Sequence, residues 1–421
     1  MAKSLRASAE GLAIVDRARQ RRGWTKTSTA RWWQDANTSR ATLRRFWQGD
    51  RIQQDIFMAL CQAVGISDWE AIAASVEISA LTPDSSPHPA GTLSANTPHL
   101  DLDEAPDVEA FYGRQAELQQ LEQWIVSDRC EVVAIAGMGG VGKTALSLAL
   151  TERVQSEFSY VIWRSLRSAP SFHHLLDSIL HLFDSGTPQT FQEQVHQLIQ
   201  HLQQHRCLLI LDGLEAVLKQ ENTCLLFLLT YLLPATHQSC ILLISRERLL
   251  ELEAVPRYRA SVRSITLQGL PNVVAVELLK AGGITGNKLE LLALSRLYSG
   301  NPLALKVVTP LIQLILGGNV AAFLNQKTLV LGDRIRTVLQ EQLEHLSDLE
   351  REIIYWLAIW QEPISFCRLQ THLLYAPDLS QVLEAVASLE RRSLLEKWFS
   401  TQEPAFTLQP LVMKVVTETL V

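Results

Sequence analysis

Short apolar runs alternate with helical patterns from residue 110 onward. The runs occupy Glu131–Ala136, Ser159–Trp163, Cys207–Leu211, Cys240–Ile244 and Ser264–Leu267. Runs of this length, without polar alternation, are typical of parallel strands buried on both faces. Because helical segments lie between them, the pattern predicts an α/β domain with a parallel sheet flanked by helices.

Helical periodicity dominates residues 8–75. Apolar residues recur there at helical spacing, as in Leu43, Phe46 and Trp47. The pattern predicts a small all-α domain that ends with a short helix capped by Asp68. Its four longer helices are expected at Gly11–Gln20, Thr27–Asp35, Ser39–Gln48 and Ile52–Val64.

The C-terminal part is also expected to be mainly helical. Residues 271–335 have an all-helical pattern, and two short strand-like pieces lie near the C-terminus. The tetrapeptide Ser347-Asp-Leu-Glu350 has the capping-box form and precedes the apolar helix Ile353–Trp360.

The composition changes at residues 77–108, which are rich in Pro, Ser, Thr and Asp and poor in apolar residues. Such a segment cannot bury enough surface to pack, so we expect a flexible linker. The predicted organisation is listed from the N-terminus: an all-α module at 1–76, a linker at 77–108, the α/β domain at 109–270, a helical domain at 271–340 and a C-terminal domain at 341–421.

Charge is distributed unevenly. The net charge is −6, yet residues 1–51 carry 12 Lys and Arg against 4 Asp and Glu, and the remainder carries 26 against 40. This asymmetry indicates that the basic N-terminal module has its own partner, either nucleic acid or an acidic protein face.

The cysteines and the apolar stretches indicate a cytoplasmic protein without a membrane segment. No CxxC pair occurs among Cys61, Cys130, Cys207, Cys224, Cys240 and Cys367, so we expect reduced thiols and neither a disulfide framework nor a metal cluster. The N-terminus lacks the apolar core of a signal peptide, and the most apolar stretch, Leu225–Leu233, is too short to span a bilayer.

The sequence Gly137-Met-Gly-Gly-Val-Gly142-Lys143-Thr144 fits the P-loop pattern at every fixed position. A predicted strand precedes it and a predicted helix, Ala145–Val154, follows. Glycines let the backbone curl until several N–H groups point at phosphate oxygens, and the helix N-terminus adds a partial positive charge. The predicted phosphate ligands are Gly137, Gly139, Gly140, Val141, Gly142, Lys143 and Thr144, with Lys143 on the β- and γ-phosphates and Thr144 on Mg²⁺.

A carboxylate, Asp212, follows the predicted strand Leu208–Leu211. Asp212 is expected at the carboxyl edge of the sheet, where it would ligate Mg²⁺ directly or through water; the alternative is a turn cap. The next residue is Gly213, where hydrolases often place an acid that polarises the attacking water, and Glu215 lies two residues further on. We therefore expect slow hydrolysis of ATP.

These elements together resemble the NB-ARC branch of the STAND signalling ATPases over about residues 109–421. Phe111 to Leu118 is similar to the family's first motif, and the resemblance implies that Arg114 lies near the nucleotide base. Ile241 to Arg246 is similar to the strand whose terminal arginine senses the γ-phosphate, although Arg246 also fits a solvated strand end and Arg248 is an alternative sensor. Gly300-Asn301-Pro302-Leu303-Ala304 is similar to the GLPL motif, so Pro302 would pack on adenine, or else mark an ordinary turn.

The resemblance also extends to the C-terminal domain, Leu346–Val421, which is similar to the family's winged helix. The family usually places a histidine against the ADP β-phosphate near the end of this domain, and Gln409 stands at that position here. Gln409 donates a hydrogen bond but carries no charge, so the resemblance implies a weaker or different lock on the ADP state.

The N-terminal module resembles helix-turn-helix domains of the phage repressor type and N-terminal modules of bacterial STAND proteins. Arg40, Arg44 and Arg45 share one face of the predicted helix Ser39–Trp47. That face suits either a DNA groove or, as we favour, a protein partner on an adaptor domain.

The resemblance implies a signalling switch that binds ATP, ADP and Mg²⁺, closed with ADP and open with ATP. In the open state it would form a homo-oligomer and act through its N-terminal module on a protein effector. Family members usually carry a repeat sensor after the winged helix, so sensing here is expected to use a partner, the existing domains or a separate chain. The alternatives are an ATP-regulated transcription regulator that binds DNA through residues 1–51, and a constitutive ATPase, which Gly213 disfavours.

Overall fold

The chain of 421 residues divides into two compact units, Met1–Ala95 and Asn96–Val421. The computed structural model describes residues 4–22, 32, 36, 42–43, 46–47, 52–66, 69, 72–73, 98–108, 111–183, 190–218, 228–249, 261–326, 329–373, 378–399 and 404–420. Within this described part, no helix has both the length and the apolar character needed to cross a membrane.

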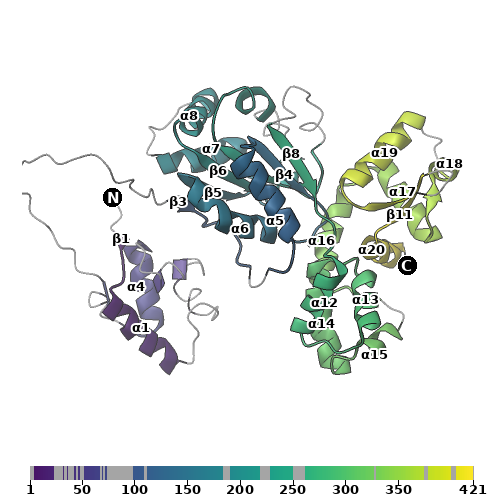
Figure 1. The fold of residues 1–421 in the computed structure, drawn as a ribbon, viewed down its shortest axis with the longest axis horizontal. Helices are drawn as coiled ribbons and strands as arrows, with labels where there is room; N and C mark the ends of the chain where they lie inside the picture. Colours follow the sequence, from purple (N-terminus) through teal and green to yellow (C-terminus); the bar gives the residue numbers. More distant parts are fainter. Residues whose placement is uncertain are drawn as a thin grey trace, which may run out of the picture. The chain divides into compact units, whose positions relative to one another are not determined.

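The N-terminal unit contains helices α1 (Ala9–Arg21) and α4 (Gln54–Ala63) (Figure 1). Trp32 is buried in the core of this unit, where the indole nitrogen donates to the Leu60 carbonyl at 3.1 Å. The all-α prediction was wrong in one detail, because β1 (Ser4–Leu5) and β2 (Ile52–Gln53) form a short antiparallel pair. Most of the predicted second and third helices, with Trp33, Arg40, Arg44 and Arg45, lies outside the described residues.

The second unit begins with a six-stranded parallel sheet in the order β3-β5-β6-β7-β4-β8 (Figure 1). Each predicted strand is present, with ends that differ by up to two residues. Their bounds are β3 His99–Asp101, β4 Val132–Ala136, β5 Tyr160–Ser165, β6 Cys207–Asp212, β7 Cys240–Ile244 and β8 Val262–Thr266.

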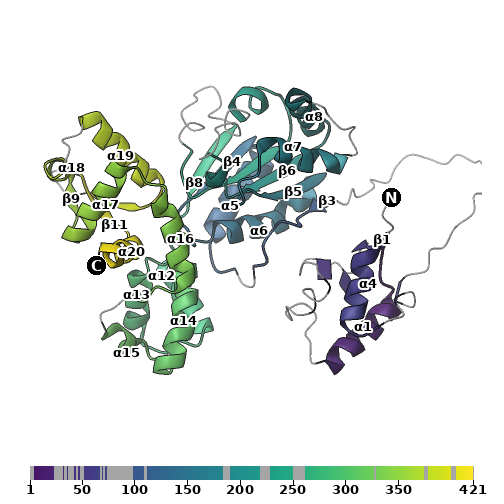
Figure 2. The same cartoon turned by 180° about the vertical axis from the view of Figure 1, so that it is seen from behind.

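Helices cover both faces of this sheet, as predicted. Alternate residues of one strand enter different cores: Val133 and Ile135 pack with α5 and α6, whereas Val132 and Ala134 pack with α7 and α8. Figure 2 shows the layers from behind. The helices around the sheet are α5 Gln115–Glu122, α6 Lys143–Val154, α7 Phe172–Leu180, α8 Phe191–Gln204 and α9 Glu215–Leu218, with short turns of 3-10 or π type at Gln123–Ser127, Gln155–Glu157, His181–Phe183 and Leu228–Leu232.

The linker prediction was wrong for residues 98–108. Strand β3 lies there, at the edge of the sheet and parallel to β5. It is fixed by an ion pair between Asp101 and the buried Arg164 of β5, with 2.7 Å between Oδ2 and Nη2. A three-residue strand has no periodicity to find, so only the tertiary partner reveals it.

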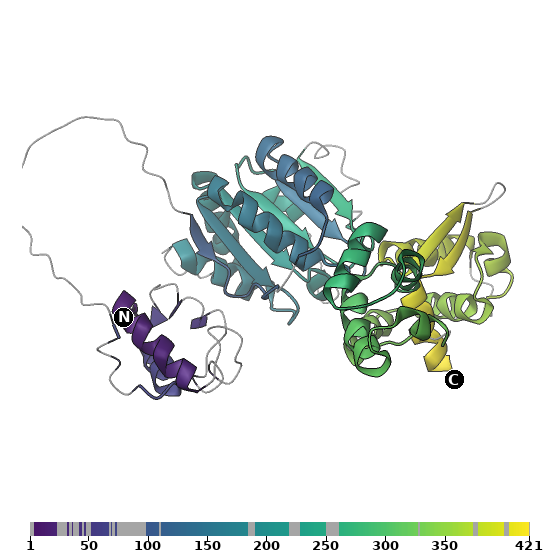
Figure 3. The same ribbon diagram turned by 60° about the horizontal axis from the view of Figure 1, so that its bottom comes forward.

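Helices dominate the rest of the unit, as predicted (Figure 3). The capping box at Ser347 and Glu350 is confirmed at the start of α17. The helices are α12 Asn272–Ala281, α13 Lys288–Leu297, α14 Pro302–Leu316, α15 Val320–Leu324, α16 Asp333–Glu344, α17 Asp348–Trp360, α18 Phe366–Gln370, α19 Leu379–Arg391 and α20 Pro410–Leu420.

The C-terminal part also contains a small antiparallel sheet in the order β10-β11-β9. Its strands are β9 Ile364–Ser365, β10 Leu395–Phe399 and β11 Pro404–Leu408. Assignment of this part as a winged helix stays a prediction. Helix α16 runs across the predicted boundary at residue 340, and its Ile335 and Leu339 belong to one hydrophobic core with residues from α12 to α20.

The pairing of Asp101 with Arg164 generates a stability test. Asp101→Asn should lower the free energy of unfolding by about 1.5–3 kcal/mol, because a buried guanidinium loses a hydrogen bond to a charged partner. Urea unfolding of the full chain measures this. Glu122→Gln, in the exposed pair with Arg153, is the control and should change stability by less than about 0.5 kcal/mol. An Asp101→Asn variant as stable as wild type would contradict the role given to β3.

Candidate functional site

The loop between β4 and α6 has the backbone that a phosphate cradle needs. Gly137, Gly140 and Gly142 have φ angles of 145°, 78° and 102°, values that side chains other than glycine rarely adopt. Gly142 is the N-cap of α6, which begins at Lys143. The loop therefore presents a helix N-terminus at the carboxyl edge of the sheet, where anions are favoured.

Lys143 is folded into the loop. Its side-chain nitrogen donates to the carbonyl oxygens of Gly137 at 2.6 Å and Met138 at 3.0 Å. Burial lowers the pKa of Lys143 to about 8, and the neighbouring carboxylates of Glu215 and Asp212 oppose that shift. The ammonium group is thus held inside the cradle, where a phosphate would replace the carbonyl oxygens as its acceptor.

Thr144 and Asp212 lie together, as the P-loop reading requires. The hydroxyl oxygen of Thr144 is 3.3 Å from both carboxylate oxygens of Asp212. Burial raises the pKa of Asp212, whereas Arg167 and the Thr144 hydrogen bond lower it. A hydroxyl and a carboxylate are the hard oxygen ligands that Mg²⁺ prefers, so these two residues fit that ion.

Arg167 is a residue of this site that the sequence did not reveal. Its Nη2 atom lies 3.0 Å from Asp212 Oδ2 and 3.4 Å from Thr144 Oγ1. The sequence feature that could have indicated it is its position two residues after β5, at the same edge of the sheet as Asp212. Its contacts with Asp212 and Thr144 are what identify it as part of the site.

Arg246, at the end of β7, contacts residues from two other elements. Its Nε atom is 3.1 Å from Glu215 Oε1, and its backbone N–H donates to Glu215 Oε2 at 3.0 Å. Its other nitrogens donate to the Val338 carbonyl at 3.3 Å and to Glu341 at 3.1 Å, both on α16. The alternative sensor, Arg248, instead donates its backbone N–H to the Arg391 carbonyl at 3.1 Å.

Arg114 holds the P-loop from one side. Its φ angle is 61°, at the N-cap of α5. The buried guanidinium donates to the carbonyls of Val141 at 3.0 Å and Gln268 at 2.6 Å, and it pairs with Glu117 at 2.9 Å. Arg114 therefore fixes the loop through its backbone; its predicted contact with the base stays a prediction.

The start of α14 holds the loop from the other side. Asn301 caps α14 and donates from its side-chain nitrogen to the Gly139 carbonyl at 3.0 Å, while the backbone N–H of Leu303 donates to the Gly140 carbonyl at 3.3 Å. Pro302 lies beside Gly142, with its Cγ 3.7 Å from the position of a Cβ added there. A Cβ on Gly139 would lie only 2.4 Å from Val338, so α16 also packs directly on the loop.

Residues of the P-loop and of the C-terminal part of the chain line a common cavity of about 260 Å³. Met138 and Val141 line it from the loop, Asn301 from the start of α14, and Glu396 and Gln409 from the C-terminal part. Gln409 and the loop thus face one space. Burial raises the pKa of Glu396, a carboxyl group that the sequence did not single out.

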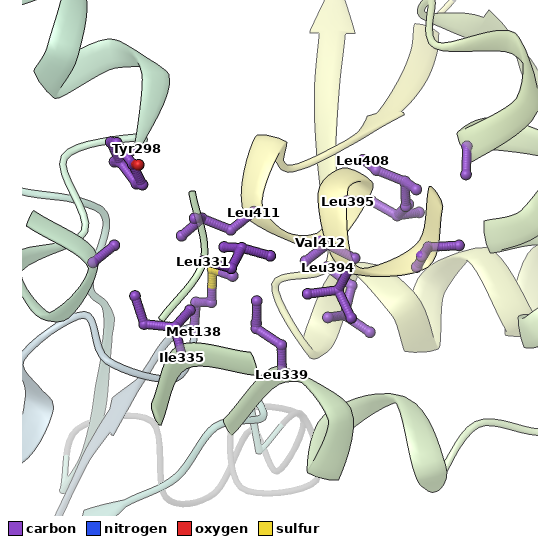
Figure 4. Packing of buried hydrophobic residues seen from close by; sticks show 14 of the residues in the cluster. Met138, Tyr298, Leu331, Ile335, Leu339, Leu394, Leu395, Leu408, Leu411 and Val412 are labelled. Atoms are coloured by element: carbon purple, nitrogen blue, oxygen red, sulfur yellow. The ribbon is translucent and has the colours of Figure 1, made fainter. Parts of the chain in front are cut away.

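Met138 anchors the loop in the C-terminal core. It is buried in the same cluster as residues of α16 and α20. Figure 4 shows its side chain near Leu331, Ile335, Leu339 and Leu411. Met138 occupies a position of the P-loop pattern that accepts any residue, so the pattern does not predict this contact.

Comparison with known proteins gives one family match and several relatives. Residues 114–265 match the NB-ARC domain. The chain is 34% identical over 461 aligned residues to an uncharacterized WD repeat-containing protein of Nostoc sp., an alignment that covers 99% of this chain and 36% of the relative. The chain therefore spans about a third of the length of that relative.

Two further similarities are more limited. Disease resistance protein SUMM2 of Arabidopsis thaliana is 30% identical over 98 residues, which is 23% of this chain and 11% of that protein. A Walker-type ATPase of Pyrococcus abyssi has a similar fold, with a TM-score of 0.52 and 15% identity over 73% of this chain and 96% of that one.

The domain match begins at Arg114 within the first motif and includes the P-loop, Asp212 at the end of β6 and Arg246 just after β7, and the solved ATPase shares this fold. Residues 114–265 of this chain are therefore an NB-ARC domain, in a part of the chain that has the fold of a P-loop ATPase.

Proposed function

We propose that this chain is a nucleotide-dependent signalling switch that ADP holds closed and ATP opens. The observation that carries the proposal is the attachment of Arg246 to α16. A side chain at the edge of the nucleotide site donates to the Val338 carbonyl and pairs with Glu341 on a helix 92 to 95 residues further along the chain. The nucleotide site and the C-terminal core are thus coupled through one arginine.

Competition for Arg246 supplies the opening step. A terminal phosphate of ATP carries more charge than the Glu341 carboxylate and accepts charge-assisted hydrogen bonds from a guanidinium. ATP would draw Arg246 away from α16, whereas ADP has no group at that place and leaves the attachment intact. A ligand shifts an equilibrium only through such a difference between the two states.

The closed state is further supported by the contacts of the P-loop. Met138 is buried in the core that α16 and α20 share, and Gln409 faces the cavity beside Val141. We assign Gln409 to the ADP phosphate, Pro302 and Arg114 to the base end of the nucleotide, and the loop residues to the phosphates. Thr144 and Asp212 are the proposed Mg²⁺ ligands, and the ion would neutralise phosphate charge.

Slow hydrolysis is consistent with the side chains around the site. Gly213 provides no acid, and both carboxylate oxygens of Glu215 are engaged by Arg246. A carboxylate held in that way is poorly placed to activate water, so the nucleotide state would persist long enough to act as a signal.

Release of α16 and α20 would expose surface for assembly into a homo-oligomer. The N-terminal unit is a separate compact unit, which suits an effector or recruiter that acts on a protein partner. The alternative of DNA binding through residues 1–51 rests on Arg40, Arg44 and Arg45, which lie outside the described residues.

The first prediction from the proposed function concerns Lys143. Lys143→Ala should weaken ADP binding at least about tenfold, because a hydrogen bond between charged groups contributes about 1.5–3 kcal/mol. Isothermal titration of the full chain measures the affinity, with the exposed Lys288→Ala as control. Unchanged affinity in Lys143→Ala would show that the phosphates bind elsewhere.

The second prediction separates the two nucleotides. Arg246→Ala should reduce ATP affinity much more than ADP affinity, since a sensor of the terminal phosphate contacts only ATP. Glu341→Gln should do the reverse and raise ATP affinity about two- to fivefold, the usual range for a half-exposed ion pair. Fluorescent nucleotide titrations measure both.

The control for this pair is Glu344→Gln, on the same helix, which should behave as wild type. Equal losses of ATP and ADP binding in Arg246→Ala would indicate a general structural role, and an unchanged ATP affinity in Glu341→Gln would rule out competition for Arg246.

The third prediction concerns the lock on ADP. Gln409→His should slow ADP dissociation about 5- to 30-fold, since a charge-assisted hydrogen bond to the β-phosphate would add about 1–2 kcal/mol. Stopped-flow with a fluorescent ADP analogue measures the rate, and Gln203→His, at an exposed position of α8, is the control. Dissociation as fast as in wild type would mean that Gln409 does not face the phosphate.

A further inference from the structure

Arg167 is held beside Asp212 by the backbone. Residue 165, at the end of β5, pairs with Asp212 of β6. The next N–H, from Leu166, donates to the Asp212 carbonyl at 2.7 Å, and a tight turn closes with Ala169 N–H on the Leu166 carbonyl at 2.9 Å. Ala169 has a φ of 48°, a conformation that costs energy for alanine. These backbone hydrogen bonds therefore fix the position of Arg167 at the edge of the sheet.

The guanidinium contacts the same oxygens that would hold Mg²⁺. Nη2 of Arg167 lies 3.0 Å from Asp212 Oδ2 and 3.4 Å from Thr144 Oγ1. Asp212 is buried, and a buried carboxylate requires a cation or a proton. Two cations cannot share these oxygens, because their repulsion at such distances is several kcal/mol outside bulk water.

Most of the Arg167 side chain faces solvent. It is 64% exposed, against 5% for the Asp212 side chain. Exposed side chains change rotamer on the picosecond to nanosecond scale. The contact is therefore one that a competing ligand can break.

Gly213 provides the space for this arrangement. Its φ is 88°, and a Cβ added there would lie 2.9 Å from Arg167 Cγ. Any larger residue at position 213 would push the arginine stem away from Asp212. The missing acid at Gly213 and the presence of Arg167 are thus two parts of one local structure.

We propose that Arg167 is a stand-in cation: it neutralises Asp212 in the metal-free site, and a divalent cation that binds Thr144 and Asp212 displaces it onto a terminal phosphate oxygen of the nucleotide. The phosphate half rests on the proposed function, and the metal half does not. A guanidinium is suited to this transfer, since carboxylate and phosphate oxygens match the same fork of N–H donors.

The metal half is tested by titrating the full chain with Mn²⁺ in the absence of nucleotide. Electron paramagnetic resonance measures the concentration of free Mn²⁺, and the bound fraction follows. Arg167→Met and Arg167→Gln remove the charge and should bind Mn²⁺ about three- to fivefold more tightly than wild type, the upper part of the range for one partly exposed ion pair. Arg167→Lys keeps the charge and should stay within about twofold of wild type. Arg153→Met, on the exposed surface of α6, is the matched control.

If both neutral variants bind Mn²⁺ no more tightly than wild type does, the metal half is wrong. It is also wrong if neither wild type nor any variant binds Mn²⁺. Binding in Arg167→Lys as tight as in Arg167→Met would overturn it as well, because charge would then not be the competitor. The two neutral variants check one another, and their melting curves without Mn²⁺ show whether each is folded.

The phosphate half is tested by ATP and ADP titrations in excess Mg²⁺. Arg167→Met should lose about tenfold in ATP affinity and keep its ADP affinity, since only ATP offers the terminal phosphate. Equal ATP affinity in mutant and wild type would overturn this half alone. Failure of the proposed switch appears elsewhere, as equal losses of ATP and ADP affinity in Arg246→Ala, and would not affect the Mn²⁺ result.

Discussion

The backbone carbonyls of the P-loop need hydrogen-bond donors, and this requirement organises the molecule around the loop. A loop that turns its N–H groups inward for phosphate directs its carbonyls to the opposite side, where buried acceptors must be satisfied. Donors from two separate segments meet them: Asn301 at Gly139, and Arg114 at Val141. The family motifs around the loop are therefore explained as its supports.

The same requirement couples the site to the distant core. The donors at Gly139 and Gly140 belong to the start of α14, and α16 packs on Gly139 through Val338. Under the proposed function, a change in the loop on binding nucleotide would reach helices of the C-terminal part, and Arg246 adds an electrostatic connection to α16. At the sheet edge, Asp212 and Glu215 are each balanced by an arginine, so a bound phosphate or metal would redistribute several charges together.

The sequence was informative where a local pattern and a chemical requirement coincide. Continuous apolar runs predicted the strands because both faces of the sheet are covered, and the P-loop glycines predicted the positive φ angles because few other residues tolerate them. The capping box at Ser347 was readable for the same reason. The contacts of Arg167, Met138 and Glu341 were not predictable, since each depends on a partner far away in the chain and has no required neighbour in sequence. Strand β3 was missed because three residues with a buried ion pair do not form a period.

Hydrogen–deuterium exchange of the full chain, with ADP and with a slowly hydrolysed ATP analogue, tests the coupling of the nucleotide site to α16 most directly. Exchange reports local opening in the intact protein. The account predicts that peptides of α16 (Asp333–Glu344) and α20 (Pro410–Leu420) exchange faster with the ATP analogue than with ADP, while those of the sheet strands stay unchanged. Equal exchange of α16 and α20 under the two nucleotides, with both bound at saturation, would contradict it.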